Sequence, residues 1–231
     1  MSFVKKSLGQ NFLIDKNIIK KIINLVDINN RNVIEIGPGR GALTEEILAK
    51  KPRSLILVEK DLNLSKKLKF KYCNNKIINV LNNDILKLNL EKTIKNNSII
   101  FGNLPYNISS QILVKVLKLD NLKNKLSNII FMFQKELGQK IIGEYQSPNY
   151  GRLSILTNYK LNFVQKFFVS RNCFTPKPKV TSMIIHFIPK FSSKHRISNL
   201  HTLEKVTNII FSKKIKMINK SLKSLLDDFQ I

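Results

Sequence analysis

Short apolar runs alternate along the chain with segments whose apolar residues recur at helical spacing. The apolar runs predict buried strands over 32–36, 54–58, 76–80, 98–101, 128–133, 163–169 and 183–188. Helical spacing predicts helices after Asp15, over 43–50, from about 61, over 109–119 and from about 134. Strands that alternate with helices predict an α/β fold in which helices cover both faces of a parallel sheet.

Polar residues follow the predicted strands at their carboxyl ends. They are the loop from Glu35 to Gly41, then Glu59, Asp84 and Asn103, one after each of four successive strands. In a parallel sheet these ends meet at one edge, where α/β folds bind their ligands. The sequence therefore predicts one ligand site that all four features share.

The chain changes character after Pro189. Residues 191–199 are polar and basic, and two helical patterns follow over 200–211 and 215–229. We predict an α/β domain over 1–190 and a small all-α C-terminal domain over 191–231. Two helices form a thin core, so we expect this second domain to be incomplete.

The charge of the chain is strongly positive. Its 231 residues include 40 Lys and Arg against 15 Asp and Glu, for a formal net charge of +25. This balance favours a polyanionic partner, with nucleic acid first. The abundance of Lys, Asn and Ile also fits a nucleotide bias of the source genome, in which case some lysines are only solvated surface.

Neither a membrane nor an oxidising compartment is indicated. No apolar stretch reaches membrane-spanning length, and the first ten residues lack the apolar core of a signal peptide. The two cysteines, Cys73 and Cys173, form no Cys-x-x-Cys motif. We expect a cytoplasmic protein with no membrane segment, no disulfide scaffold and no metal site.

The glycine loop leaves two kinds of cofactor open. Gly37-x-Gly39-x-x-Ala42 satisfies the dinucleotide fingerprint, so a nicotinamide dehydrogenase is one reading. S-adenosylmethionine, a nucleoside that carries an amino acid and no phosphate, would use the same loop differently. Glu59 suits a ribose diol in both cases. Asp84 is placed to bind an adenine amino group, for which a Rossmann dehydrogenase has no need.

The segment Asn103-Leu104-Pro105-Tyr106 carries groups that suit methylation of a nucleobase amine. The amide oxygen of Asn103 and a neighbouring backbone carbonyl can accept hydrogen bonds from an exocyclic NH2 group. Pro105 stiffens the backbone, and the ring of Tyr106 can stack on a base. A plain turn after a strand is the alternative interpretation of these four residues.

Several uncommon motifs occur in a characteristic order. They are Gly-Gln-Asn-Phe-Leu (9–13), Glu-Ile-Gly-Pro-Gly-Arg-Gly-Ala-Leu-Thr (35–44), Asn-Leu-Pro-Tyr-Asn-Ile-Ser (103–109), Gln-Lys-Glu (134–136), Tyr-Gly-Arg-Leu-Ser (150–154) and Phe-Thr-Pro-Lys-Pro-Lys-Val (174–180). Over about 5–190 the chain closely resembles the ribosomal RNA adenine dimethyltransferases of the bacterial small-subunit type. The related large-subunit enzymes usually carry Ile where Leu104 stands.

The resemblance implies a Rossmann-like, class I S-adenosylmethionine-dependent methyltransferase domain and a role for each matching residue. It assigns cofactor contacts to Gln10, Asn11, Leu13, Gly37, Gly39, Glu59, Lys60, Asp84, Ile85 and Asn103. It assigns the catalytic segment to Asn103, Leu104, Pro105 and Tyr106, with Phe174 as a second ring that clamps the target adenine. The three histidines, His186, His195 and His201, lie outside every motif and are read as structural or surface groups.

The activity implied by the resemblance is dimethylation of two adjacent adenosines in the 3′-terminal hairpin loop of small-subunit (16S) rRNA. The implied partner is that RNA in a pre-ribosomal particle, bound by a monomer. Methylation of large-subunit (23S) rRNA and a mainly non-catalytic role in ribosome assembly or RNA binding stay open. The chain departs from the family pattern over 211–216, where lysines stand in place of an arginine-rich cluster. Lysine keeps the charge and loses the planar fork that suits phosphate.

Overall fold

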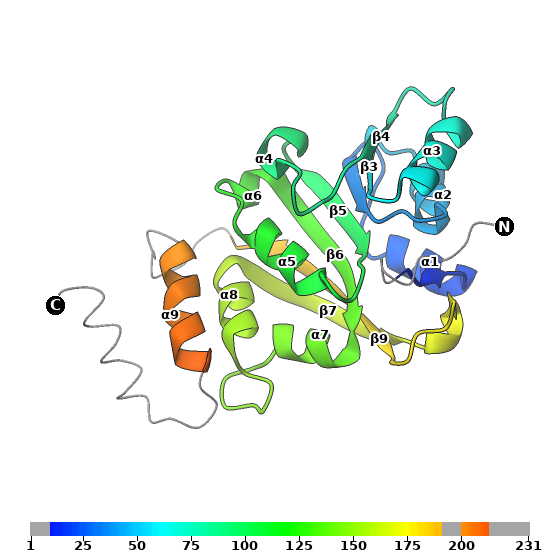
Figure 1. The fold of residues 1–231 in the computed structure, drawn as a ribbon. Coiled ribbons are helices and arrows are strands. Elements are labelled where there is room, and N and C mark those ends of the chain that lie inside the picture. Colours follow the sequence, from blue (N-terminus) through cyan, green and yellow to red (C-terminus); the bar gives the residue numbers. More distant parts are fainter. Residues whose placement is uncertain (1–9, 191–199, 213–231) are drawn as a thin grey trace.

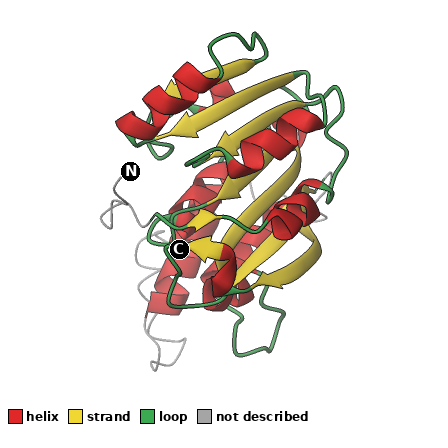
Figure 2. Ribbon diagram, turned by 90° about the vertical axis from the view of Figure 1, so that its right-hand side faces the viewer, coloured by secondary structure: helices red, strands yellow, loops and turns green. Residues whose placement is uncertain are grey.

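The computed structural model describes residues 10–190 and 200–212, and its centre is a seven-stranded sheet in the order β4-β3-β2-β5-β6-β9-β7 (Figure 1). The strands are β2 (Asn32–Ile36), β3 (Ser54–Glu59), β4 (Ile78–Asn82), β5 (Ser98–Asn103), β6 (Leu126–Gln134), β7 (Leu161–Val169) and β9 (Ser182–Pro189). The helices beside them are α1 (Lys16–Ile23), α2 (Ala42–Ala49), α3 (Leu62–Lys71), α4 (Leu90–Thr93), α5 (Ser109–Leu117), α6 (Leu122–Lys125), α7 (Lys135–Ile141) and α8 (Arg152–Lys160). Helices lie on both faces of the twisted sheet (Figure 2).

The sheet is parallel except for its last hairpin. β4, β3, β2, β5 and β6 pair in parallel, whereas β9 pairs antiparallel with both β6 and β7. The prediction of a parallel sheet is therefore wrong for the hairpin of β7 and β9. The segment 170–181 between them holds a 3₁₀ turn and a two-residue strand, not the crossover helix that usually joins parallel neighbours.

Each face of the sheet buries its own hydrophobic cluster. Ile34 and Ile36 of β2 belong to the cluster under α5, while Val33 belongs to the cluster under α1 and α2. A strand that is buried on both faces has no polar face to alternate with. This is why Val33, Ile34 and Ile36, without a strict apolar-polar alternation, correctly predict β2.

The predicted elements mostly agree with the observed ones to within two residues. The helix predicted after Asp15 is α1, whose first turn is capped because the Asp15 carboxylate accepts from the backbone N–H groups of Asn17 and Ile18, at 2.9 and 3.0 Å. β4 begins two residues later than predicted. Its pairing with β3 starts at Ile78, although the Ile77 carbonyl still accepts from the Leu55 N–H at 2.8 Å.

A second, two-stranded sheet joins distant parts of the chain. β1 (Phe12–Leu13) pairs antiparallel with β8 (Phe174–Thr175), so that Leu13 lies opposite Phe174. Ile14 extends the contact by donating its N–H to the carbonyl of Cys173, at 2.8 Å. Pairs this short leave no periodic signal in a sequence, so the pattern analysis misses them. They hold the segment before α1 beside the carboxyl edge of the main sheet.

The last described helix, α9 (Leu200–Ser212), packs against the α/β body. Arg152 of α8 and Lys118 after α5 both form ion pairs with Glu204, each at 2.6 Å. Leu200 and Leu203 pack against the core cluster under α5. The first C-terminal helix is thus present, and the second, predicted over 215–229, lies outside the described residues. The domain boundary at 190 stays a prediction. Within the described ranges, no helix is long and apolar enough to cross a membrane.

Candidate active site

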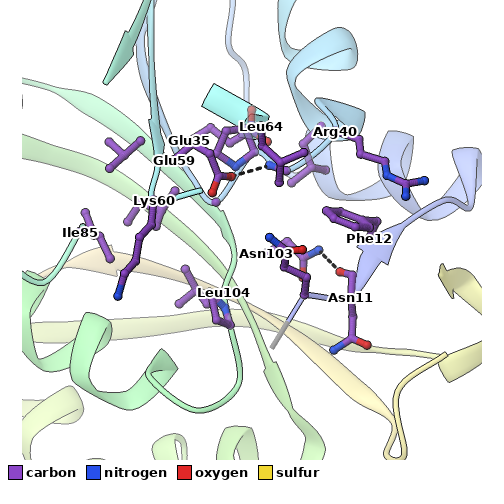
Figure 3. A pocket seen from close by; sticks show the side chains of 18 of the residues that line it. Asn11, Phe12, Glu35, Arg40, Glu59, Lys60, Leu64, Ile85, Asn103 and Leu104 are labelled. Carbon is purple, nitrogen blue, oxygen red and sulfur yellow. Dashed lines mark hydrogen bonds between the residues drawn. The ribbon is translucent and has the colours of Figure 1, made fainter. Parts of the chain in front are cut away.

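A cavity opens at the carboxyl ends of β2, β3 and β5, with β1 on one side and the loop after β4 on another (Figure 3). The structure brings thirteen of the predicted site residues to its wall: Gln10, Asn11, Leu13, Gly37, Gly39, Glu59, Lys60, Asp84, Ile85, Asn103, Leu104, Pro105 and Tyr106. The four polar features that follow successive strands therefore share one site. The role of each residue stays a prediction.

The glycine loop approaches its neighbours too closely for a side chain. Gly37 and Gly39 have φ values of 68° and 58°, in the left-handed region that favours glycine. A Cβ on Gly37 would lie 3.4 Å from the Asn103 carbonyl oxygen, and one on Gly39 would lie 2.9 Å from the Phe12 ring. The positive φ values disfavour a side chain at both positions, and at Gly39 a Cβ would also press on the Phe12 ring.

The Glu59 carboxylate is buried behind this loop and anchors it. Its Oε2 accepts from the Gly39 N–H at 3.1 Å, and its Oε1 accepts from the Asp61 N–H at 2.8 Å. Burial raises the pKa of Glu59, and these two backbone donors act in the opposite direction. Each carboxylate oxygen has a second lone pair, so Glu59 can still accept from a ligand hydroxyl.

Asp84 places a second acceptor in the cavity, beside an apolar wall. The Lys60 ammonium lies 2.9 Å from its Oδ2, and the Leu86 N–H donates to its Oδ1 at 2.9 Å. The hydrogen bond from Lys60, followed by that from Leu86, lowers the pKa of Asp84. The group is therefore a carboxylate at neutral pH. Ile85 is buried next to it, so a flat ring that carries an amino group suits this end of the cavity.

The amide of Asn103 has a fixed orientation. Its Nδ2 donates to the backbone carbonyl of Asn11 at 3.1 Å, which ties the end of β5 to the segment before β1 (Figure 3). The Oδ1 end of the amide is thereby the acceptor. The Pro105 carbonyl already accepts from the Ile108 N–H at 3.1 Å, whereas no backbone N–H of residues 10–190 or 200–212 donates to the Leu104 carbonyl. Oδ1 and the Leu104 carbonyl are the two acceptors best suited to an NH2 group.

Tyr106 lines the same cavity, held at its hydroxyl. The Tyr106 hydroxyl and the Ser182 hydroxyl of β9 lie 2.6 Å apart. Burial raises the pKa of Tyr106, so the phenol is neutral at physiological pH. The Tyr106 carbonyl accepts from the Ser109 hydroxyl at 3.2 Å at the start of α5. Anchored at both its backbone and its hydroxyl, the Tyr106 side chain has a fixed position in the cavity.

The structure does not bring Phe174 to the cavity. Its side chain is 3% exposed and packs in the core cluster under α1 and α2, with its backbone paired to Leu13. In the described structure β8 turns this ring into the core, and its role as a clamp on the target adenine stays a prediction. Pattern analysis could not detect this, since an aromatic residue before a proline reads equally well as core or as platform.

Besides the thirteen predicted site residues, others line the cavity, among them Phe12, Arg40 and Glu35. Phe12 covers Gly39, and the Arg40 guanidinium lies 4.6 Å from the centre of the Phe12 ring (Figure 3). Glu35 is the third, 2% exposed, and its Oε2 accepts from the Thr44 hydroxyl at 2.6 Å. Their only signal in the sequence is membership of the 9–13 and 35–44 motifs.

Burial raises the pKa of Glu35 to about 8, outweighing the Thr44 hydrogen bond. Because this value lies above the ordinary 4.5, the folded protein keeps a proton that the unfolded chain releases between about pH 4.5 and 8. The contribution of Glu35 to stability is therefore full below pH 4.5 and is lost as the pH rises through 8.

We therefore expect the free energy of unfolding of the wild type to fall between pH 6 and pH 9. In Glu35→Gln, which carries a neutral group of the same shape, it should fall less. Each pKa unit corresponds to about 1.4 kcal/mol, so the variant should be the more stable protein at pH 9 by a few kcal/mol, to order of magnitude. Urea unfolding at several pH values measures this. Parallel pH profiles for the two proteins would contradict it.

Comparison with known proteins agrees with this geometry. The described fold resembles a solved dimethyladenosine transferase from Plasmodium falciparum, with a TM-score of 0.76 and 28% identity over 92% of this chain and 74% of that chain. It also resembles the solved 23S rRNA methyltransferase ErmE, with a TM-score of 0.71 and 28% identity over 92% of this chain and 84% of that one. The fold and site thus define a Rossmann-like methyltransferase of class I.

The family follows from the sequence matches. The family model described as ribosomal RNA adenine dimethylase matches residues 1–230. A relative from Pelagibacter ubique (strain HTCC1062), named "Ribosomal RNA small subunit methyltransferase A", is 44% identical over 225 residues, or 97% of this chain and 84% of the relative. One of the same name from Francisella tularensis subsp. novicida (strain U112) is 38% identical over 98% of this chain and 86% of its own. The chain belongs to the ribosomal RNA adenine dimethylase family and is a methyltransferase.

Proposed function

We propose that the protein dimethylates the exocyclic amines of two adjacent adenosines in the 3′-terminal hairpin loop of small-subunit (16S) rRNA. It would act as a monomer in the cytoplasm, on RNA within a pre-ribosomal particle, and so contribute to small-subunit biogenesis. The names of the relatives from Pelagibacter and Francisella support the small subunit as substrate. The positive charge of +25 suits an RNA partner.

S-adenosylmethionine is the proposed methyl donor, and the cavity residues fit its parts. Glu59 would accept from the ribose hydroxyls, and Asp84 would accept from the adenine amino group beside Ile85. The bare backbone of Gly37 and Gly39 leaves space for the methionine end. Around these groups, the remaining cofactor contacts would come from Gln10, Asn11, Leu13 and Lys60. When bound, the cofactor supplies an electrophilic methyl group on a sulfonium.

The observation that carries the proposal is the amide of Asn103, fixed by the Asn11 carbonyl with its Oδ1 as the acceptor. Oδ1 and the Leu104 carbonyl would accept from the two N–H bonds of the target amine. Those bonds favour a pyramidal nitrogen, whose lone pair is less delocalised into the ring, and they stabilise the positive charge that develops there. The charged amine is acidic after it gains a methyl group, and its proton passes to solvent.

Two observations distinguish this proposal from its rivals. A nicotinamide dehydrogenase shares the glycine loop and Glu59 but needs neither the Asp84 acceptor nor the Asn103 segment. A mainly non-catalytic RNA-binding factor would not need a cavity that keeps all of its predicted cofactor donors and acceptors. Large-subunit (23S) rRNA is the nearest alternative substrate, and Leu104 together with the relatives' names favours the small subunit.

Calorimetric titration tests the cofactor assignment. We expect S-adenosylmethionine to bind and NAD not to bind, with labelled methyl groups passing to unmethylated small-subunit particles. Binding of NAD with no binding of S-adenosylmethionine would refute the proposal.

The Tyr106 ring is expected to hold the target base by stacking. Tyr106→Ala should lower kcat/KM for RNA by an amount that corresponds to about 1–3 kcal/mol of binding free energy. This is the usual contribution of one base stacked on an aromatic ring. Tyr106→Phe keeps the ring and loses only the bond to Ser182, so it is the matched control and should stay close to the wild type. An RNA dependence of the rate that is the same in all three proteins would reject the stacking role.

A further inference from the structure

The edge strand β7 exposes aromatic side chains that no contact in the described structure requires. Phe163 is 44% exposed and Phe168 is 52% exposed, although both lie within a nine-residue strand. β4 and β7 are the two edge strands of the sheet, so β7 pairs only with β9 and its other side has no strand partner among the described residues (Figure 1). Large apolar side chains at an open edge usually mark an interaction surface.

The register places these rings on one face. Phe163 lies opposite Phe187, Lys166 opposite Ile185 and Phe168 opposite Met183. The three partners on β9 belong to the core cluster under α5. A bulge after Phe163 shifts the alternation, which is why three side chains that are not evenly spaced in sequence share a face. Along β9 the two rings are four residues apart, or about 13 Å.

A lysine accompanies each ring. The Lys166 ammonium lies 5.9 Å from the centre of the Phe163 ring, and the Lys135 ammonium lies 5.3 Å from that of Phe168. No acidic residue lies in β7, and the nearby Glu136 is paired with Lys140 at 2.8 Å. We call Phe163, Lys166, Phe168 and Lys135 the β7 stripe.

The composition of the β7 stripe indicates its partner. Single-stranded nucleic acid binds where rings accept bases by stacking and cations accept phosphates. A second copy of this chain would set like charges against each other, in a protein whose net charge is already +25. Charge complementarity therefore favours RNA over self-association.

One end of the β7 stripe lies near the cavity. Val169, the last residue of β7, is opposite Ser182, whose hydroxyl is the partner of Tyr106, and Phe168 precedes Val169 with its side chain on the other face of the sheet. From β5 to β7 the sheet order crosses β6 and β9, or three strand spacings of about 4.8 Å each. Phe168 is thus close enough to Tyr106 for one RNA substrate to contact both.

We propose that the β7 stripe binds a single-stranded segment of the RNA substrate outside the methylated hairpin, stacking bases on Phe163 and Phe168 and pairing phosphates with Lys135 and Lys166. The inference rests on the proposed function only for which RNA is bound. The stacking and phosphate contacts that we assign to the stripe do not depend on it.

Fluorescence anisotropy with labelled single-stranded oligoadenylate tests the proposal on the full chain. We expect the double variant Phe163→Ala, Phe168→Ala to bind about tenfold or more weakly, and the double variant with Trp at both positions to keep its affinity. Phe70→Ala is the matched control, since Phe70 is 85% exposed on α3, far from β7 in the sheet order, and it should bind normally. The double variant Lys135→Ala, Lys166→Ala should lower the slope of log affinity against log salt by about two.

Unchanged oligoadenylate binding in the Phe double variant, with the fold intact by circular dichroism, would overturn the proposal. A second contradicting result would be that the wild type sediments as a dimer, while the Phe double variant sediments as a monomer and keeps its RNA affinity. The test is independent of the substrate assignment. Weaker oligoadenylate binding in the variant supports the β7 stripe even if the wild type fails to methylate small-subunit RNA.

Discussion

Asn103→Ala is expected to lower turnover by at least about 100-fold while S-adenosylmethionine binding stays largely intact. The alanine removes the Oδ1 acceptor, and the Leu104 carbonyl alone cannot orient both N–H bonds of the amine. Loss of one positioned partner of a charge that develops in the transition state costs about 10²–10³ in kcat.

Single-turnover methyl transfer at saturating RNA measures this effect. Asn103→Ala also frees the Asn11 carbonyl, so cofactor affinity must be measured on the same preparation. Asn63→Ala is the control, an exposed asparagine in the first turn of α3. Near-normal turnover of Asn103→Ala would remove Asn103 from the mechanism.

Glu59→Gln should have the second largest effect, a loss of cofactor affinity of about 100-fold. The backbone N–H groups of Gly39 and Asp61 each donate to one carboxylate oxygen. The glutamine amide replaces one oxygen with NH2, so one donor faces another donor and the loop loses an anchor. Hydrogen bonds to a charged group contribute about 1.5–3 kcal/mol each, and the ribose contact is weakened as well.

Titration calorimetry with S-adenosylmethionine measures this loss, and thermal unfolding checks that the variant is folded. Glu136→Gln is a suitable control because it also neutralises a glutamate, in an exposed pair with Lys140 on α7. Wild-type cofactor affinity in Glu59→Gln would show that the carboxylate does not hold the ribose.

Most of the main sheet can be predicted from sequence because its strands are buried on both faces. Ile34 and Val33 belong to opposite clusters, so the neighbouring apolar residues of β2 are typical of a strand that is buried on both faces. The capping carboxylate of Asp15 sets the start of α1 in the same local way. The shared position of Glu59, Asp84 and Asn103 follows from sheet topology, since parallel neighbours end at one edge.

The parts that sequence could not predict depend on contacts between distant residues. The β1–β8 pairing joins Leu13 to Phe174 across most of the chain, and it turns the Phe174 ring into the core. The reversal of the last hairpin depends on how β9 inserts between β6 and β7. The exposure of Phe168 depends on β7 being an edge strand, which no local pattern records.

The most direct test of the account is to map methyl transfer from labelled S-adenosylmethionine onto unmethylated small-subunit particles and, separately, onto large-subunit RNA. We predict dimethylated adenosines at two adjacent positions in the 3′-terminal hairpin loop of the small-subunit RNA, and no label on large-subunit RNA. Label on large-subunit RNA alone, or no transfer to either RNA by protein that binds the cofactor tightly, would contradict the assigned substrate.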